Sequence, residues 1–311
     1  MPAQGGPAPP PEPNALFTCP APDSERMTMD VDETALLSES LRATMTACTG
    51  TTLDTALREF GWLDLLTESP DLAVPLVFRL LGETGAHAPI LNDVVAHAAG
   101  RELPATVALP AAGGRWVRWA RAEDLSPTAP EDHDSVRADQ PSFEGRTTAD
   151  ALDPELPLHT VPAGETLPLA AGRRALSWWL VGSSRTMLAL ARRHALDRVQ
   201  FGRPLAAHQA VRHRLAETLV AIEGAEATLS VADTDLGALL AKAAAGQAAR
   251  ITARHCQQIL GGIGFTAEHD FHRHARRVLV LDGLLGSTTE LTREAGTWVR
   301  THHGAPRLAQ L

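Results

Sequence analysis

Apolar residues recur at helical spacing through most of the second half of the chain. Leu176, Leu180 and Met187 share one side of the first such segment. A stripe of this kind is typical of a helix that buries one face. The pattern predicts five helices here, over residues 172–199, 211–229, 236–260, 267–278 and 287–300. Long helices joined by short loops favour a four-helix bundle.

The first half of the chain shows shorter segments. One helix is expected to start near Asp30, and others are expected over residues 53–60, 75–81 and 90–98. Residues 101–165 differ, because Pro, Gly and Asp separate short apolar stretches such as 105–109 and 115–119. That composition indicates a few strands joined by turns.

The predicted fold is therefore mainly α, in four parts. Residues 1–26 are rich in Pro and Gly and are expected to form a disordered extension. A helical domain should follow over residues 27–100, and a short β middle domain over residues 101–165. The C-terminal helical bundle should occupy residues 166–311.

Composition narrows the class of protein. With 311 residues and 44% hydrophobic residues, the chain is long enough for a sizeable core. Its net charge of -9 and pI near 5.8 argue against nucleic acid or an anionic membrane as the main partner. The sequence has no apolar run of the length that crosses a membrane. Three widely spaced cysteines do not indicate a disulfide framework, so we expect a cytoplasmic protein.

One dense polar patch follows the first long helix. It contains Arg198, Gln200 and Phe201, and Gln209 lies eight residues beyond Phe201. An arginine at a helix end can pair with a pyrophosphate, a phenylalanine can pack on a ring system, and a glutamine can bond a ribose or a base edge. The alternative is a solvated helix end that carries a single apolar side chain.

A second patch ends the third long helix. Gln258 precedes the adjacent glycines Gly261 and Gly262. One glycine would suffice to end a helix, whereas two glycines also let a cofactor approach the backbone closely. Neither patch matches a phosphate-binding loop or a dinucleotide-binding fingerprint.

Several histidines near this loop raise the question of a metal site. His269 and His272 are three residues apart, and Cys256 precedes them in the chain. Their spacing permits shared ligation, but no histidine–carboxylate signature for zinc accompanies it. We therefore expect a solvated helix face here and no metal.

Together the two patches resemble the C-terminal helical domain of the acyl-CoA dehydrogenase family. The resemblance rests on R-x-Q-F-G-x-P at residues 198–204 followed by Gln209, and on Q-x-x-G-G-x-G-F at residues 258–265. It implies an FAD-dependent α,β-dehydrogenation of an acyl-CoA thioester, with electrons passed on to an electron-transfer acceptor. The implied substrates include fatty, branched, steroid and polyketide-like thioesters, and hence a role in lipid or steroid metabolism.

The resemblance also assigns residues to the FAD. The first patch would clasp the adenosine–pyrophosphate end of an FAD bound by a neighbouring subunit, and the second would reach the same cofactor. The residues expected to contact FAD are Arg198, Gln200, Phe201, Gln209, Gln258, Gly261, Gly262 and Ser287. Arg173 is expected to face the acyl-CoA.

The chain departs from the family at the catalytic base. Removing the weakly acidic α-proton of a thioester needs a buried carboxylate within reach of that proton. The two places where the family carries this glutamate correspond to Gly172 and Leu285, and neither residue can accept a proton. The β middle domain is also short and lacks the flavin-binding loops of the family, so it is expected to be reduced.

Three explanations remain open. The chain can be the non-catalytic half of a heteromer whose homologous partner subunit supplies the base. It can be a self-sufficient homo-oligomer with a displaced base, for which Glu165 and Glu290 are candidates. It can also be a subunit without turnover, whether it binds acyl-CoA or flavin or is a purely structural helical bundle without a cofactor.

Overall fold

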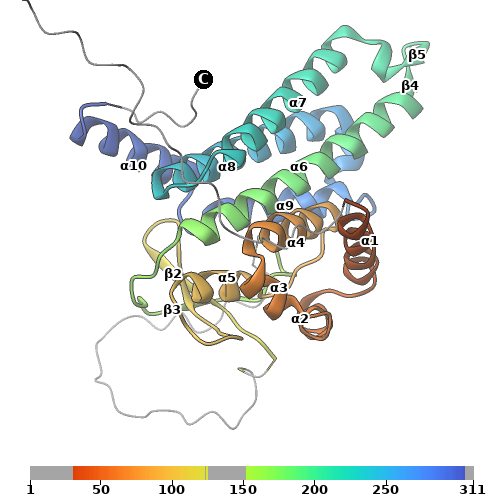
Figure 1. Ribbon diagram of the computed structural model, residues 1–311. Helices are drawn as coiled ribbons and strands as arrows, with labels where there is room; N and C mark the ends of the chain where they lie inside the picture. The colour runs from red at the N-terminus through yellow and green to blue at the C-terminus, as the bar shows by residue number, and fades with distance from the viewer. Residues whose placement is uncertain (1–30, 123, 125–151, 305–311) are drawn as a thin grey trace, which may run out of the picture.

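The computed structural model describes residues 31–122, 124 and 152–304. The extension expected over residues 1–26 lies outside this part of the chain. Within the described part the fold is mainly helical, as the apolar pattern predicts (Figure 1).

The C-terminal half forms the predicted bundle. Helices α6, α7, α8 and α9 pack side by side, and α10 lies against α8 (Figure 1). The helices are α6 Ala170–Asp197, α7 Gln209–Ser230, α8 Asp235–Leu260, α9 Phe271–Gly283 and α10 Thr288–Thr301. Helix α9 begins later than the expected residue 267, because a 3-10 turn, η4 (Gly261–Phe265), follows α8.

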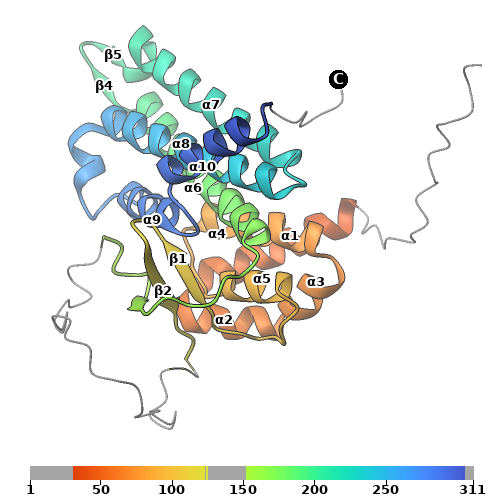
Figure 2. The ribbon, with the colours of Figure 1, turned by 90° about the vertical axis from the view of Figure 1, so that its left-hand side faces the viewer.

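The N-terminal helices cover one side of α6, and α4 lies along it (Figure 2). They are α1 Val31–Ala47, α2 Gly50–Glu59, α3 Trp62–Glu68, α4 Pro70–Thr84 and α5 Leu91–Ala98. Helix α3 was not predicted, because it is separated from α2 only by Phe60 and Gly61. Helix α4 begins at Pro70 rather than Pro75, since Pro70 occupies its first turn, where proline is well tolerated.

Residues 101–165 contain a small antiparallel sheet in the order β1-β2-β3. Its strands are β1 Ala108–Ala111, β2 Arg115–Trp119 and β3 Leu158–Val161. In the register, Leu109 pairs with Val117, and Val117 pairs with Thr160. The sheet meets the bundle where Ala111 forms a bridge with Leu284, just after α9.

Helices α4 and α6 cross at a pair of glycines. A Cβ added to Gly182 would lie 2.2 Å from the carbonyl oxygen of Arg79, and one added to Gly82 would lie 2.4 Å from that of Trp179. The absence of both side chains lets the two backbones touch. One hydrophobic core consequently runs from Leu41 in α1 to Leu285 beyond α9.

In the described part of the chain, none of the helices combines the length and the apolar character needed to cross a membrane. The domain boundaries at residues 100 and 165 remain predictions.

Replacing Gly182 by alanine should destabilise the protein, because the added methyl group would overlap the backbone of α4. We expect Gly182→Ala to lower the free energy of unfolding by at least about 1–3 kcal/mol. Gly224→Ala on α7 is the matched control, since nothing lies within 4 Å of its added Cβ. The control should be neutral or gain up to about 1 kcal/mol from helix propensity. Urea denaturation of both variants measures the difference, and equal midpoints would contradict the crossing.

Candidate functional site

A tight hairpin follows α6 and carries the first patch. Strands β4 (Val199–Gln200) and β5 (Arg203–Pro204) are joined by Phe201 and Gly202. Both joining residues have positive φ, 55° and 76°, which suits a two-residue type I′ turn. Positive φ is uncommon for phenylalanine, and the Phe201 ring is 88% exposed. The hairpin therefore presents an aromatic ring outside the fold of this chain.

The hairpin, the start of α7 and the end of α8 border a cleft of about 770 Å³. Residues from both predicted patches line it, together with apolar residues and with two polar residues, His194 and Arg214, that the sequence did not point to. The polar and glycine lining includes His194, Arg198, Gln200, Arg214, Gln258 and Gly261. Gly262 lines the cleft as well. The structure thus brings five of the predicted FAD residues to one place.

The cleft is suited to an anion. Arg198 and Arg214 contribute two guanidinium groups, and carboxylates are absent from its lining among the described residues. Burial lowers the pKa of His194, and the nearby His269 and Arg198 lower it further. Arg214 lies five residues beyond Gln209 on the same helix, a spacing that puts the two residues on different faces, so the helical period offered no signal for it.

The two glycines of the second patch play different roles. Gly261 ends α8 with φ 62° and ψ -136°, a conformation that is essentially restricted to glycine. Gly262 has no such constraint, because its φ is not in the left-handed range and its added Cβ would meet nothing within 4 Å. The end of helix α8 explains the glycine at position 261 but not the one at position 262. The space beside the backbone of Gly262 is open, so a ligand can approach it closely.

Gln209 and Ser287 lie apart from the lining of this cleft. Gln209 begins α7 beside it, with its side-chain nitrogen 3.4 Å from Nε2 of His213. Ser287 is the N-cap of α10 and donates its hydroxyl to Glu290 at 2.7 Å. Lys242, which contacts the turn before Ser287, and Gln258 are roughly 24 Å apart along α8 by helical rise. Ser287 therefore belongs to the opposite end of the bundle.

The two positions predicted from the resemblance to correspond to the base of the family meet at that opposite end. A Cβ added to Gly172 would lie 2.7 Å from Cδ1 of Leu285 and 2.8 Å from Cγ2 of Val95. Leu285 is buried, with φ 56°, and Leu91 lies close behind. Apolar side chains consequently fill the space that a base at either position would need.

Leu285, Val95 and Leu91, which fill the space in front of Gly172, form an apolar plug. Arg173 lies against this plug. Its Nε donates to the carbonyl oxygen of Leu285 at 3.1 Å, and its Nη2 lies 3.7 Å from Glu294. Both contacts are made within the chain. The predicted acyl-CoA residue thus supports the turn that carries Leu285.

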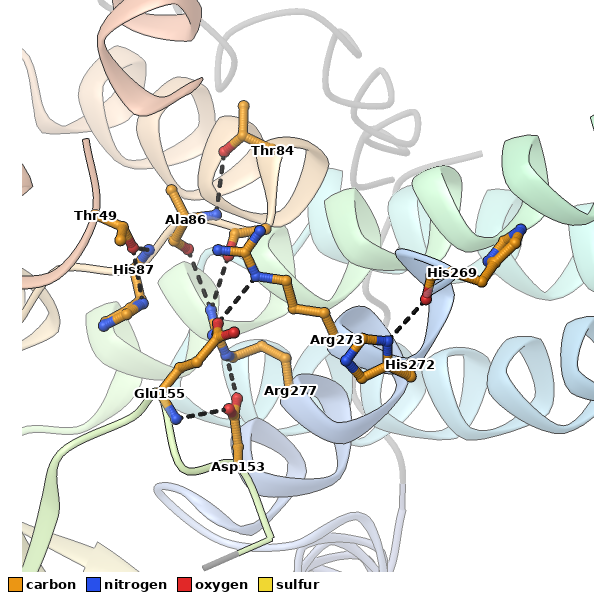
Figure 3. Close-up of polar contacts among 11 residues, drawn as sticks. Thr49, Thr84, Ala86, His87, Asp153, Glu155, His269, His272, Arg273 and Arg277 are labelled. Carbon is orange, nitrogen blue, oxygen red and sulfur yellow. Dashed lines mark hydrogen bonds and ion pairs between the residues drawn. The ribbon is translucent and has the colours of Figure 1, made fainter. Parts of the chain in front are cut away.

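The histidines first considered for a metal make local contacts instead. Nδ1 of His272 lies 2.7 Å from the carbonyl oxygen of His269 (Figure 3). Nδ1 of His269 accepts from the amide of Phe271 at 3.2 Å. Among the residues that the structure describes, no group of three metal-binding side chains gathers anywhere.

A buried ionic cluster joins α9 to the segment before β3 (Figure 3). Arg277 is 1% exposed and pairs with Asp153 and Glu155. His87 lies near this cluster, and its Nδ1 is 2.9 Å from the hydroxyl oxygen of Thr49. Burial, and then the charge of Arg277, lowers the pKa of His87 to about 4.

Comparison with known proteins finds similarity to one family. A profile described as acyl-CoA dehydrogenase, C-terminal domain, matches residues 165–295. Acyl-CoA dehydrogenase IpdE2 of Mycobacterium tuberculosis is 31% identical over 199 residues, which are 62% of this chain and 58% of that protein. Acyl-CoA dehydrogenase FadE34 of the same organism is 36% identical over 129 residues, which are 38% of this chain and 17% of that protein. Over residues 165–295 the chain is therefore similar to the C-terminal domain of the acyl-CoA dehydrogenase family.

Solved structures share the overall fold of this chain. The Tcur3481-Tcur3483 steroid ACAD variant aligns with 88% of this chain and 99% of that chain, at a TM-score of 0.64 and 19% identity. The ChsE4-ChsE5 complex from Mycobacterium tuberculosis aligns with 90% of this chain and 99% of that chain, at a TM-score of 0.57 and 17% identity. In sequence, by contrast, this acyl-CoA dehydrogenase homologue spans less than two thirds of the length of IpdE2 or FadE34.

Acid should destabilise the protein through its buried histidines. Burial and the nearby arginines lower the pKa of His274 as well as His87 to about 4, whereas an unfolded histidine titrates near 6.5. Between these values the unfolded chain binds more protons, so the free energy of unfolding falls as pH drops from about 6.5 to about 4. Each histidine accounts for up to about 3 kcal/mol of that fall.

Urea titrations at several pH values measure this slope. His87→Asn removes one titrating group while it keeps a polar atom near the Thr49 hydroxyl. The slope between pH 6.5 and 4 should become shallower in this variant, and an unchanged slope would show that His87 is not a cause of the acid sensitivity.

The contact between Gly172 and Leu285 should appear as energetic coupling. Gly172→Ala alone should cost at least about 1 kcal/mol, because the new methyl group displaces Leu285 and Val95. In a Leu285→Ala background the same substitution should cost less, since part of the obstruction is gone. A double-mutant cycle by urea denaturation should give a coupling of about 1 kcal/mol. Strict additivity would mean that the two positions do not touch.

Proposed function

We propose that this chain is a subunit of a flavin-dependent acyl-CoA dehydrogenase. Its bundle supplies the adenosine half of an FAD site shared with a second, homologous subunit. The assembly would remove hydrogen from the α and β carbons of an acyl-CoA thioester, and electrons would then pass to an electron-transfer acceptor. FAD, when bound, accepts the hydride from the β carbon.

The cleft beside the hairpin carries the proposal. Its guanidinium groups, Arg198 and Arg214, fit the negative charge of a pyrophosphate. Gln200 and Gln258 add donors and acceptors for a ribose or an adenine edge. Phe201 offers an exposed ring face nearby. These features match the non-reacting end of FAD.

The apolar plug supports the assignment to a non-catalytic half. Gly172 and Leu285 provide no proton acceptor, and their surroundings are apolar. A base supplied by the partner subunit would complete the chemistry. One of the structural relatives is a complex of two differently named proteins, ChsE4 and ChsE5. A pairing of unequal subunits is accordingly part of the proposal.

The displaced-base alternative has weaker support. Glu165 is exposed and pairs with Arg101. The amide of Gly113 and the amide and hydroxyl of Ser287 donate to Glu290 and lower its pKa to about 2. A useful base for this reaction needs a carboxylate whose pKa is raised by burial. Neither glutamate meets that requirement, and a structural bundle without a cofactor would leave the cationic cleft without a role.

Flavin content tests the proposal directly. The chain is purified alone, and again after co-expression with a homologous subunit that carries the family's glutamate. Flavin absorbance only in the co-purified complex is the expected result. A colourless complex would favour the structural bundle, and flavin bound stoichiometrically by the chain alone would favour a self-contained site.

Arg198→Ala should weaken flavin binding in that complex. Loss of one charge-assisted contact to a pyrophosphate costs about 1.5–3 kcal/mol, or roughly ten- to hundredfold in affinity. Arg300→Ala is the matched control, because Arg300 is exposed on α10, away from the cleft. Both complexes are titrated with FAD and followed by flavin fluorescence. Equal affinities would remove Arg198 from the site.

A further inference from the structure

Lys242 is the sole lysine of the chain, in which every other Lys or Arg position is an arginine. It lies on α8 at the end of the bundle that holds the apolar plug, and its side chain is fully buried. A buried ammonium is costly unless it is well bonded. Its position and its partners therefore need an explanation.

The ammonium group bridges the turn between α9 and α10. Its Nζ donates to the carbonyl oxygen of Asp282 at 3.1 Å and to that of Gly286 at 3.4 Å. These two carbonyls lie on either side of Leu285. The carboxylate of Asp282, 3.9 Å from Nζ, in turn accepts from the amide of Thr288 at 3.2 Å and from its hydroxyl at 2.6 Å.

An ammonium fits this position better than a guanidinium. It is compact, with three donors that can point in different directions, whereas a guanidinium is a larger planar fork. Burial lowers the pKa of Lys242 to about 8, although Asp282 opposes the shift. The desolvation is thus only partly offset, so the lysine contributes little net stability.

Leu285 needs to be held in place. Its φ of 56° is left-handed, which costs a residue with a side chain about 1–2 kcal/mol. Its amide donates to the carbonyl oxygen of Pro110 at 2.8 Å, and its own carbonyl accepts from Arg173. Its side chain fills the space in front of Gly172.

We propose that Lys242 is a positioning residue that locks the turn over residues 284–287 in the conformation that plugs this chain's own acyl position. The inference rests on the proposed function for the meaning of that position, and on the contacts above for the lock itself. If Leu285 swung out, the carbonyl of Gly286 would leave Lys242. The buried ammonium would then lose a partner, and this penalty disfavours other conformations of the turn.

The lock provides conformational specificity, and its signature differs from that of an ordinary stabilising contact. Lys242→Met removes the buried charge and fills similar volume. Because apolar replacements of buried charges are often neutral or stabilising, the melting temperature should stay level or rise. Hydrogen exchange at the amides of Leu285 and Thr288 should nevertheless accelerate by about tenfold or more, because the turn is no longer specified. Amides in the centre of α6 should keep their wild-type rates.

The experiment compares three forms of the full chain by hydrogen exchange and thermal unfolding: wild type, Lys242→Met and Thr252→Val. Thr252 is a second fully buried polar residue on α8, far from the turn, so its variant should leave exchange at residues 284–288 unchanged. Unchanged exchange in Lys242→Met, or faster exchange throughout together with a lower melting temperature, would overturn the lock.

The single lysine gives a second readout in the native protein. Reductive methylation should modify Lys242 at least about a hundredfold more slowly in the native chain than in the urea-unfolded chain, because Lys242 must first be exposed by opening of the turn. Comparable rates would overturn the proposal. Neither readout depends on flavin, so a colourless complex would reject the proposed function while leaving the lock to be judged by its own result.

Discussion

The architecture depends on the close crossing of α4 and α6. Gly82 and Gly182 let the two backbones touch, so α6 can serve both layers of the molecule at once. One face of α6 supports the N-terminal helices, and another packs against α8 within the bundle. The two ends of α6 then carry the two groups of predicted site residues. Its C-terminal end carries the hairpin and the cleft, and its N-terminal end carries Gly172 and Arg173.

This separation divides chemistry between the ends of one bundle. The cleft near Arg198 gathers cationic and amide groups and leaves a glycine backbone open. The plug near Leu285 consists of apolar side chains, and Arg173 and Lys242 donate hydrogen bonds to the backbone of its turn. A subunit that helps to hold a cofactor but performs no proton transfer needs only the first of these ends to remain open.

Much of the fold could be predicted from the sequence, because apolar positions in long amphipathic helices recur with the helical repeat. The short helix α3 could not, since only Phe60 and the left-handed Gly61 separate it from α2. The cleft residues were predictable where a motif carried them, as with Arg198 and Gln258. His194 and Arg214 were missed because their role arises only when α6 and α7 lie side by side. Lys242 had a signal in its uniqueness as a lysine, but its contacts with Gly286 depend on a turn that periodicity cannot place.

The burial of Lys242 also has a consequence for the acylation of this chain by thioesters. Thioesters transfer their acyl groups without a catalyst to accessible, unprotonated amines. A surface rich in lysine would be slowly modified wherever such compounds accumulate. Among the lysine and arginine side chains of this sequence, all but Lys242 are guanidinium groups, which stay protonated, and the one amine side chain is buried. In the structure, acylation by a thioester would therefore find no exposed lysine amine, because the single lysine is buried.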